Sequence, residues 1–291
     1  MDYIRPRHQR VNKNKKRRLW LLAALIVLAL GVWGLLNSRK AEAPDNPKPS
    51  DEKSQLQSPV STYQPIDLQP VVDAWVAKKL PTYGIVVYDL QANQVIGQTS
   101  PDKSFFAASL YKIYVAYLAL LDMQDGKMNP DEILTGGFTN KQCVEKMIRE
   151  SHSPCGESMM ASIGQSTLNQ RVKDLGMTGT YFNGIRTTPQ DCTLILQLIN
   201  SQRDLNQANT DFLLDAMLTQ DAMFKRGLQR GAPEAKWQTK VGWNEDINYH
   251  DIGIMTMPDG RKFAVAILSQ NNGASAPIAD FSRTIYSALS L

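Results

Sequence analysis

Residues 108–121 read ASLYKIYVAYLALL, an apolar stretch that predicts a buried helix. Strands are predicted on both sides of it, at 84–90 and 94–98 before the helix and at 237–243, 251–257 and 263–268 near the end of the chain. Helical patterns fill the sequence between these two groups, with further helices predicted at 67–79 and from 279 onward. Strands at both ends with helices between them predict an α/β fold with a mixed sheet and an inserted helical lobe.

The charge of the chain is concentrated at its beginning. The whole chain carries +4, whereas residues 1–40 hold ten Lys or Arg and one acid, which is +9. The rest therefore carries −5, so we expect no nucleic-acid-binding surface on the folded part. The composition, 43% hydrophobic and 21% charged, is that of a globular protein and excludes a wholly disordered chain.

An uncharged apolar run occupies residues 19–36, directly after the basic residues 1–18. At about 1.5 Å per residue the run spans roughly 27 Å, enough for a bilayer core. The positive-inside rule then predicts a cytoplasmic N-terminal tail, one transmembrane helix and an extracytoplasmic remainder, in a single-pass protein of the cell membrane. A cleaved signal peptide is the alternative, since Ala41-Glu42-Ala43 resembles a cleavage site. The absence of a Cys after the run disfavours a lipoprotein.

Residues 37–65 are rich in proline and polar residues and hold almost no large aliphatic side chains. Such a segment cannot bury enough surface to fold, so it predicts an extracytoplasmic stalk. Regular patterning starts at residue 66, and 66–291 is predicted to form one domain, expected to be monomeric.

Three cysteines follow the apolar run. Cys143 and Cys155 are close enough in sequence to bridge a helix and the turn after it, but the sequence leaves this pairing open. Cys192 lies in an apolar helical pattern, which favours a buried, inert thiol.

Several common catalytic motifs are missing. The sequence contains no GxSxG, P-loop, HExxH or paired CxxC, and only His152 and His250 follow the apolar run. A zinc site built from His152, Cys143 and Cys155 would need a fourth ligand, and the two cysteines do not have the spacing of zinc-finger ligands. We therefore predict no metal and no cofactor.

Ser109 and Lys112 lie three residues apart at the start of the 108–121 helix, and so share one helix face. A lysine whose pKa is lowered by burial can accept the serine proton, which creates a nucleophile without histidine. The helix N-terminus adds backbone donors for oxyanion charge. The Ser-x-x-Lys spacing alone is a weak signal, since a capping serine and a solvated lysine give the same pattern.

Two further motifs strengthen the hypothesis: Ser151-His152-Ser153 after a helical pattern, and Lys240-Val241-Gly242 in a strand-like stretch. Together with IVVYDL before the serine, TTPQD at 187–191 and DIGIM near the end, they make residues 66–291 resemble the penicillin-recognising serine enzymes, most closely the catalytic domain of class A β-lactamases. The resemblance implies a β-lactamase/transpeptidase-like α/β fold, with an antiparallel sheet flanked by terminal helices and an inserted all-helical lobe.

The same resemblance implies a role for each motif residue. Ser109 would be the acylated nucleophile and Lys112 its base, while Ser151 would relay a proton to the leaving nitrogen. Lys240 would hold the substrate carboxylate and lower the pKa of Lys112, and the oxyanion hole would use the N–H groups of Ser109 and Trp243. The residues expected to contact substrate are Ser153, Gly242 and Trp243.

The chain departs from the family pattern in all three regions that handle substrate and water. The second motif is S-H-S instead of S-D-N, so His152 is expected to replace the aspartate structurally. Val241 lacks the hydroxyl that usually binds the carboxylate, and Thr239 is expected to point to the other face of the strand. The stretch 176–186, where a class A enzyme carries its water-activating glutamate, contains no acid. Asn183 could position a water there but not accept its proton, and Pro189 is expected at a capped helix start directly afterwards.

Three functions follow from these patterns. The first is a membrane-anchored serine hydrolase that is acylated by a D-alanyl peptide, a related peptidoglycan-derived amide or a β-lactam antibiotic, with slow deacylation. The second is a working β-lactamase with an unusual deacylation route, and the third a non-catalytic, cell-wall-facing binding module with a decayed site.

Other residues near the motifs have simpler interpretations: core packing for Tyr111, Tyr114 and Tyr117, and solvated surface for Arg226 and Arg230.

Overall fold

The computed structural model describes residues 66–79, 82–244 and 247–291. In these three ranges no helix is long and apolar enough to cross a membrane. The predicted tail (1–18), transmembrane helix (19–36) and stalk (37–65) lie outside the described residues.

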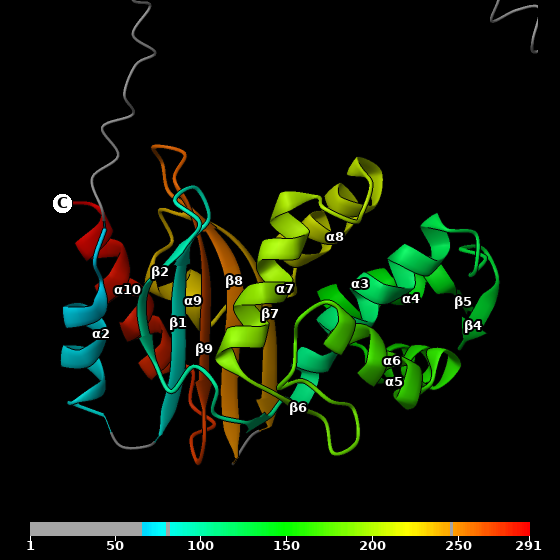
Figure 1. The fold of residues 1–291 in the computed structure, drawn as a ribbon, viewed down its shortest axis with the longest axis horizontal. Helices are drawn as coiled ribbons and strands as arrows, with labels where there is room; N and C mark the ends of the chain where they lie inside the picture. Colours follow the sequence, from blue (N-terminus) through cyan, green and yellow to red (C-terminus); the bar gives the residue numbers. More distant parts are fainter. Residues whose placement is uncertain (1–65, 80–81, 245–246) are drawn as a thin grey trace, which may run out of the picture. The chain divides into compact units, whose positions relative to one another are not determined.

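A five-stranded sheet forms the centre of the domain, with the strand order β2-β1-β9-β8-β7 (Figure 1). Its strands are β1 (Tyr83–Asp89), β2 (Gln94–Thr99), β7 (Lys236–Asn244), β8 (Asn248–Thr256) and β9 (Lys262–Ser269). The pairing of β1 with β9 joins the two ends of the domain. Every pairing in this sheet is antiparallel, so the mixed sheet predicted from the pattern alone is wrong, while the antiparallel sheet implied by the family resemblance is confirmed.

One face of the sheet is covered by the terminal helices α2 (Gln69–Val76) and α10 (Ala276–Leu289) and by the short α9 (Leu228–Gly231) (Figure 1). Alternate strand residues point to this face, among them Val265 and Ile267, because side chains alternate along a strand. Helix α10 begins three residues earlier than predicted. Its first turn contains Pro277, which suits a position where no backbone donor is needed.

The other face of the sheet packs against α7 (Pro189–Ser201) and the core of an inserted helical lobe. The lobe contains α3 (Tyr111–Gln124), α4 (Asn140–Arg149), α5 (Ser153–Ile163), α6 (Gln165–Asp174) and α8 (Gln207–Leu218). Short elements complete the described part: β3 (Phe105–Phe106), β4 (Ile133–Thr135), β5 (Phe138–Thr139), β6 (Arg186–Thr187) and the 3-10 turns η1 (Ala108–Leu110) and η2 (Ala222–Phe224).

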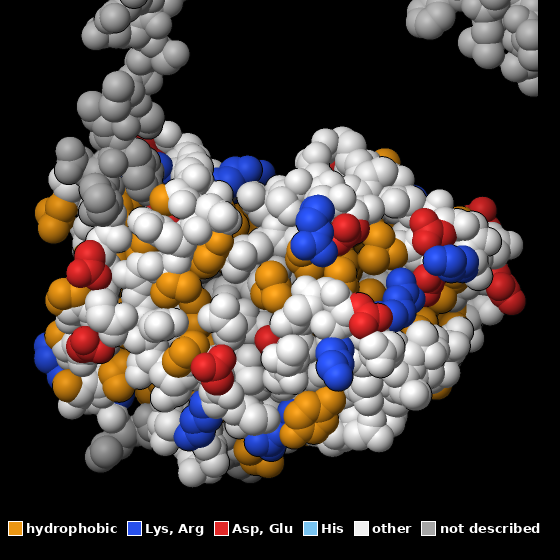
Figure 2. Space-filling model, in the orientation of Figure 1, with side chains coloured by type: hydrophobic (Ala, Val, Ile, Leu, Met, Phe, Trp, Pro, Cys, Tyr) orange, Lys and Arg blue, Asp and Glu red, His pale blue; other side chains and the backbone are white. Residues whose placement is uncertain are grey.

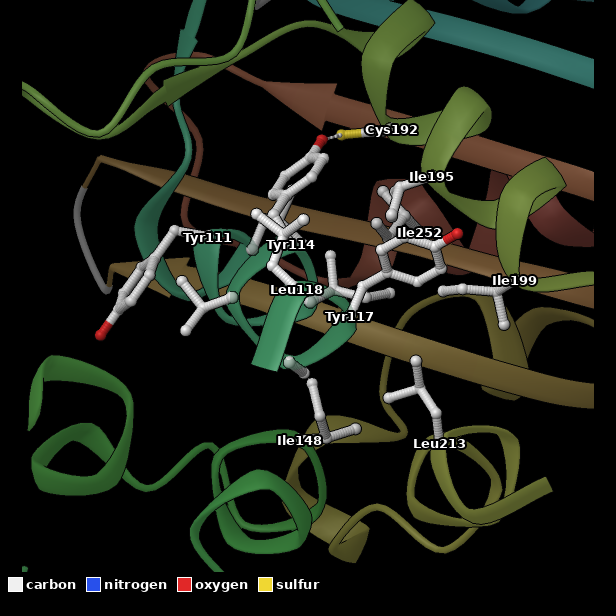
Figure 3. Close-up of a cluster of buried hydrophobic side chains, with 14 of the residues drawn as sticks. Tyr111, Tyr114, Tyr117, Leu118, Ile148, Cys192, Ile195, Ile199, Leu213 and Ile252 are labelled. Atoms are coloured by element: carbon white, nitrogen blue, oxygen red, sulfur yellow. Dashed lines mark hydrogen bonds between the residues drawn. The ribbon is translucent and has the colours of Figure 1, made fainter. Parts of the chain in front are cut away.

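Helix α3 is the central element of the lobe and is buried on nearly all sides. Tyr114 and Tyr117 are fully buried, and their hydroxyls bond to Thr187 and Asp204. In Figure 3 the Tyr117 ring lies beside aliphatic side chains of α7 and β8, and the Tyr114 hydroxyl points to Cys192 of α7. The prediction of core packing is confirmed for these two tyrosines. The consequence is that α3 is held rigidly, and the residues at its start are held with it.

The visible face of the domain in Figure 2 shows Lys and Arg interspersed with Asp and Glu. No broad basic area appears among the described residues on that face, in agreement with the acidic net charge computed for the chain after residue 40.

Candidate active site

Ser109 lies in η1, the turn that leads from β3 into α3. The backbone N–H of Ala107 donates to the carbonyl of Ile185, which ties this turn to the stretch before β6. The turn also lies against strand β7, because a side chain at Gly242 of β7 would lie only 2.6 Å from the Ala107 carbonyl oxygen. Gly242 therefore allows η1 to approach the strand. Ala108, directly before the serine, has a φ of 45°, in the left-handed region that L-residues rarely adopt.

Lys112 is buried in the first turn of α3, with 1% of its surface exposed. Its Nζ is 2.9 Å from Ser109 Oγ, 2.6 Å from the carbonyl oxygen of Ser151 and 3.3 Å from Ser153 Oγ. Burial lowers the pKa of Lys112 from 10.5 to about 8, and the negative charge of Glu157 opposes this by a smaller amount. A fraction of the lysine is thus neutral near pH 7 and within reach of the serine proton.

Ser151 and Ser153 reach the lysine from the turn between α4 and α5. Ser151 has a φ of 53°, again in the left-handed region, and this conformation directs both its carbonyl and its hydroxyl toward Lys112. A Cys143–Cys155 disulfide joins the two helices and encloses the turn, with 4.9 Å between the two Cα atoms. The pairing that the sequence left open is therefore formed.

His152 caps helix α5. Its Nδ1 accepts from the backbone N–H of Cys155 at 3.3 Å, and its ring packs edge-on against Phe138. An aspartate at this position would cap the helix in the same way. The geometry supports the structural role expected for His152.

Lys240 is fully buried on β7. It completes a hydrogen-bonded cluster of five side chains, hereafter the cluster: Ser109, Lys112, Ser151, Ser153 and Lys240. Lys240 Nζ donates to Ser151 Oγ at 3.1 Å and to the Val241 carbonyl at 2.9 Å. Burial, followed by repulsion from Lys112, lowers the pKa of Lys240 well below its ordinary range. Burial is the largest cause of the lowered pKa of each lysine, and the repulsion between the two ammonium groups, which the resemblance implied, also disfavours charging both of them.

A second polar chain ties β7 to the helical lobe. Thr239 Oγ1 donates to the side chain of Gln220 at 3.1 Å, and Gln220 Nε2 donates to the carbonyl of Ile148 at 2.9 Å. The Thr239 hydroxyl is thus bonded to Gln220. No pattern in the sequence singled out Gln220.

Val241 and Trp243 face the opposite side of the sheet from Lys240, because side chains alternate along a strand. Val241 is buried among apolar side chains there, and Trp243 packs against Tyr249 with 6.5 Å between ring centroids. Trp243, Tyr249, Met223 and Arg226 line a cavity of about 260 Å³. Arg226 and Arg230 are exposed, in agreement with a solvated surface.

The stretch 176–186 forms a short turn closed by the backbone pair Tyr181–Arg186. Asn183 is exposed and accepts a hydrogen bond from Asn169 of α6. Thr188 then caps α7, with a proline in the first turn as predicted. No carboxylate lies in this turn, so the structure offers no acid at the position where the sequence lacked one.

Sequence reasoning missed an acid beside Lys112. Glu157 lies on α5, four residues after Ser153, and its charge acts on both Lys112 and Tyr111. The four-residue spacing on a helix was the available signal.

Within the described ranges no group of three or more His, Cys, Asp or Glu side chains is arranged to hold a metal ion.

Cys192, the third cysteine, is fully buried and lies 3.3 Å from the Tyr114 hydroxyl. Burial raises the pKa of this thiol to about 12, which confirms the inert thiol predicted for it.

Comparison with known proteins gives a consistent result. The sequence profile of the "Beta-lactamase enzyme family" matches residues 67–289. The structure is similar to that of PBP-A, with a TM-score of 0.71 and 22% identity over 78% of this chain and 98% of that one. It is also similar to a β-lactamase from Chitinophaga pinensis DSM 2588, with a TM-score of 0.68 and 17% identity over 75% and 97% of the two chains. A search of curated proteins finds no match. At these identities the structural likeness establishes the fold.

Proposed function

Because this chain belongs to the β-lactamase enzyme family over residues 67–289, we propose that it is a penicillin-recognising serine hydrolase with Ser109 as its nucleophile. The observation that carries the proposal is the position of Lys112. Its amine is buried, has a lowered pKa and lies 2.9 Å from Ser109 Oγ. A solvated lysine beside a capping serine would show neither the burial nor the contacts to the second motif.

Acylation proceeds by proton transfer within the cluster. Ser109 Oγ attacks the carbonyl carbon of the substrate amide, and its proton passes to the neutral amine of Lys112. The N–H groups of Ser109 and Trp243 stabilise the oxyanion. Ser151 then gives its proton to the leaving nitrogen, the C–N bond breaks, and Ser151 recovers a proton from Lys112, whose Nζ is 3.5 Å away. Lys240 orients Ser151 through their 3.1 Å hydrogen bond.

The substrate class is a D-alanyl peptide, a related amide of the cell wall, or a β-lactam. A mutant of PBP-A, similar to this chain with 21% identity, was solved as an acyl-enzyme complex with penicillin-G, which supports acylation by a β-lactam here. Substrate anchoring relies on Lys240, Gly242 and Ser153. Because Val241 has no hydroxyl, we expect the carboxylate to be bound more weakly by about 1–3 kcal/mol.

Hydrolysis of the acyl-enzyme is expected to be slow, because the turn 176–186 holds no acid to activate water. A working β-lactamase therefore needs a base from elsewhere. A decayed binding module is disfavoured by the assembled cluster, since burying Lys112 and Lys240 is costly and serves no packing purpose that an apolar side chain would not meet better.

The test is intact-protein mass spectrometry of the purified 66–291 domain mixed with a penicillin, with the Ser109→Ala variant as control. We expect an adduct of the added penicillin mass that persists for minutes to hours on the wild-type protein and is absent from the variant. Rapid turnover that depends on Ser109 would establish an efficient β-lactamase instead. If the penicillin gave no adduct and no turnover, and a D-alanyl peptide also did not react, the proposal of a serine hydrolase would be refuted.

We further infer that the domain is anchored outside the cell membrane through residues 19–36. The inference depends on the uncharged apolar run and on the basic residues before it. In cells, the full chain is expected in the membrane fraction after alkaline washing, and protease added from outside is expected to remove the 66–291 domain. If the alkaline wash released the chain from the membrane, the anchor would be contradicted. If the 66–291 domain were protected from the added protease, its orientation would be contradicted.

A further inference from the structure

The acylation step leaves one charged side chain beside the cluster without a role. Glu157 is exposed on α5, whereas the turn 176–186, which would supply the acid for hydrolysis in a class A enzyme, contains none. The position of Glu157 is determined by how α5 packs on α3.

Helix α5 lies directly against Lys112. A methyl group at Gly156 would lie 2.9 Å from Lys112 Cε and 2.8 Å from the Tyr111 hydroxyl, so the helix backbone itself contacts the lysine and the tyrosine. One turn earlier, Ser153 Oγ is 3.3 Å from Lys112 Nζ. Residues four apart share a helix face, so Glu157 lies on the same side of α5 as Ser153, one turn further along.

The electrostatics agree with this placement. Burial, with a smaller contribution from the charge of Glu157, raises the pKa of Tyr111 to about 12, and the same charge opposes the lowering of the pKa of Lys112 by burial. Among the described residues Glu157 is the one carboxylate that shifts the pKa of Lys112. Its own side chain is open to water, as a group that must pick up a proton from a water molecule needs to be.

We propose that Glu157 is the general base for hydrolysis of the Ser109 acyl-enzyme. The inference rests on the proposed function and deepens it. A water oxygen bonds to the carbonyl carbon of the Ser109 ester, and the proton of that water passes to the Glu157 carboxylate. The C–Oγ bond then breaks, the proton held by Glu157 passes to the neutral amine of Lys112, and Lys112 gives a proton to Ser109 Oγ, so that Glu157 is again ionised and Lys112 again neutral. The products are the free acid and the original serine. An exposed carboxylate is held less rigidly than a buried one, which agrees with slow turnover.

The experiment compares the decay of the penicillin adduct in four proteins: wild type, Glu157→Gln, Glu157→Asp and Glu145→Gln. Glu145 is the matched control, because it is an acid of the same lobe that pairs with Arg149 on the surface of α4 and does not act on Lys112. Each protein is acylated, freed of excess penicillin, and followed by intact mass. We expect Glu157→Gln to retain its adduct about 10²-fold longer or more, Glu157→Asp to be intermediate, and Glu145→Gln to match the wild type.

A second readout separates loss of a base from distortion of the site. Hydroxylamine, a stronger nucleophile than water, depends less on a general base, so it is expected to release the adduct equally fast from wild type and Glu157→Gln. Equal decay in water of wild type and Glu157→Gln would overturn the role of Glu157 while leaving the proposed function intact. Slow release from Glu157→Gln by hydroxylamine as well would indicate a distorted site and overturn the role too. Absence of an adduct in every protein would overturn the proposed function, and the role of Glu157 with it.

Discussion

The rate of acylation is expected to follow the ionisation of Lys112. The amine accepts the Ser109 proton only when neutral, and burial lowers its pKa to about 8. The sign follows directly: protonation at low pH removes the base, so the rate rises with pH and levels off above the pKa. With a pKa of about 8, roughly a tenth of the lysine is neutral at pH 7 and about nine tenths at pH 9, a gain of about tenfold that ends in a plateau.

An ordinary lysine gives a different curve. With a pKa near 10.5, the rate would rise about a hundredfold between pH 7 and pH 9 and would show no plateau in this range. The assay is rapid mixing with a penicillin, acid quench and intact mass from pH 6 to pH 9.5, with Ser109→Ala to subtract non-enzymatic reaction. A steady rise through pH 9.5 would refute the lowered pKa, and a flat profile would refute Lys112 as the base.

The same curve identifies which lysine titrates. Glu157 raises the pKa of Lys112 but does not contribute to the shift of Lys240. Replacing it by glutamine is therefore expected to move the midpoint of acylation to lower pH. An unmoved midpoint would assign the titration to another group.

Substitutions at three places test the supports of the cluster. Replacing Cys143 and Cys155 by alanine opens a loop with a sequence separation of 12 and is expected to lower the free energy of unfolding by about 3 kcal/mol in urea titrations; an unchanged midpoint would show that the bridge does not stabilise the domain. Gly242→Ala would place a methyl group 2.6 Å from the Ala107 carbonyl and is expected to slow acylation about 10²-fold, whereas a wild-type rate would mean that the turn before α3 moves freely. His152→Ala should lose about 1 kcal/mol of stability by thermal unfolding and His152→Asn much less, since asparagine also caps helices; equal losses in both would contradict the capping role.

Local patterns predicted the elements of the sheet well. The predicted strands 84–90 and 263–268 lie within one residue of β1 (Tyr83–Asp89) and β9 (Lys262–Ser269) at each end, because both strands are long apolar runs bounded by polar residues. The direction of pairing was not in the pattern. Hydrophobic periodicity reports which side chains are buried, but not whether neighbouring strands run the same way, and the antiparallel arrangement came from the family resemblance.

The candidate site was predicted in its parts and not in its arrangement. Ser109 and Lys112 are neighbours on one helix, so sequence spacing was enough to bring them together. Ser151 and Lys240 lie far away along the chain, and only the family motifs indicated that they meet. The disulfide and the position of Glu157 depend on how α4, α5 and α3 pack, down to the missing side chain at Gly156. Such contacts have no periodicity that a sequence pattern could reveal.

Ala108, directly before Ser109, and Ser151, which is hydrogen-bonded to Lys112 and Lys240, both adopt a left-handed backbone. A non-glycine residue held in this conformation opposes folding by about 1–3 kcal/mol. Stability and activity are thus in conflict at these two positions. Under selection for heat resistance in the laboratory, glycine at either position would relieve the strain, but Ala108→Gly would loosen the position of the Ser109 hydroxyl and Ser151→Gly would remove the Ser151 hydroxyl. Gains in thermal tolerance at these positions would accordingly be accompanied by loss of turnover, and a stabilised version of the domain should be sought among the surface residues of α2 and α10 instead.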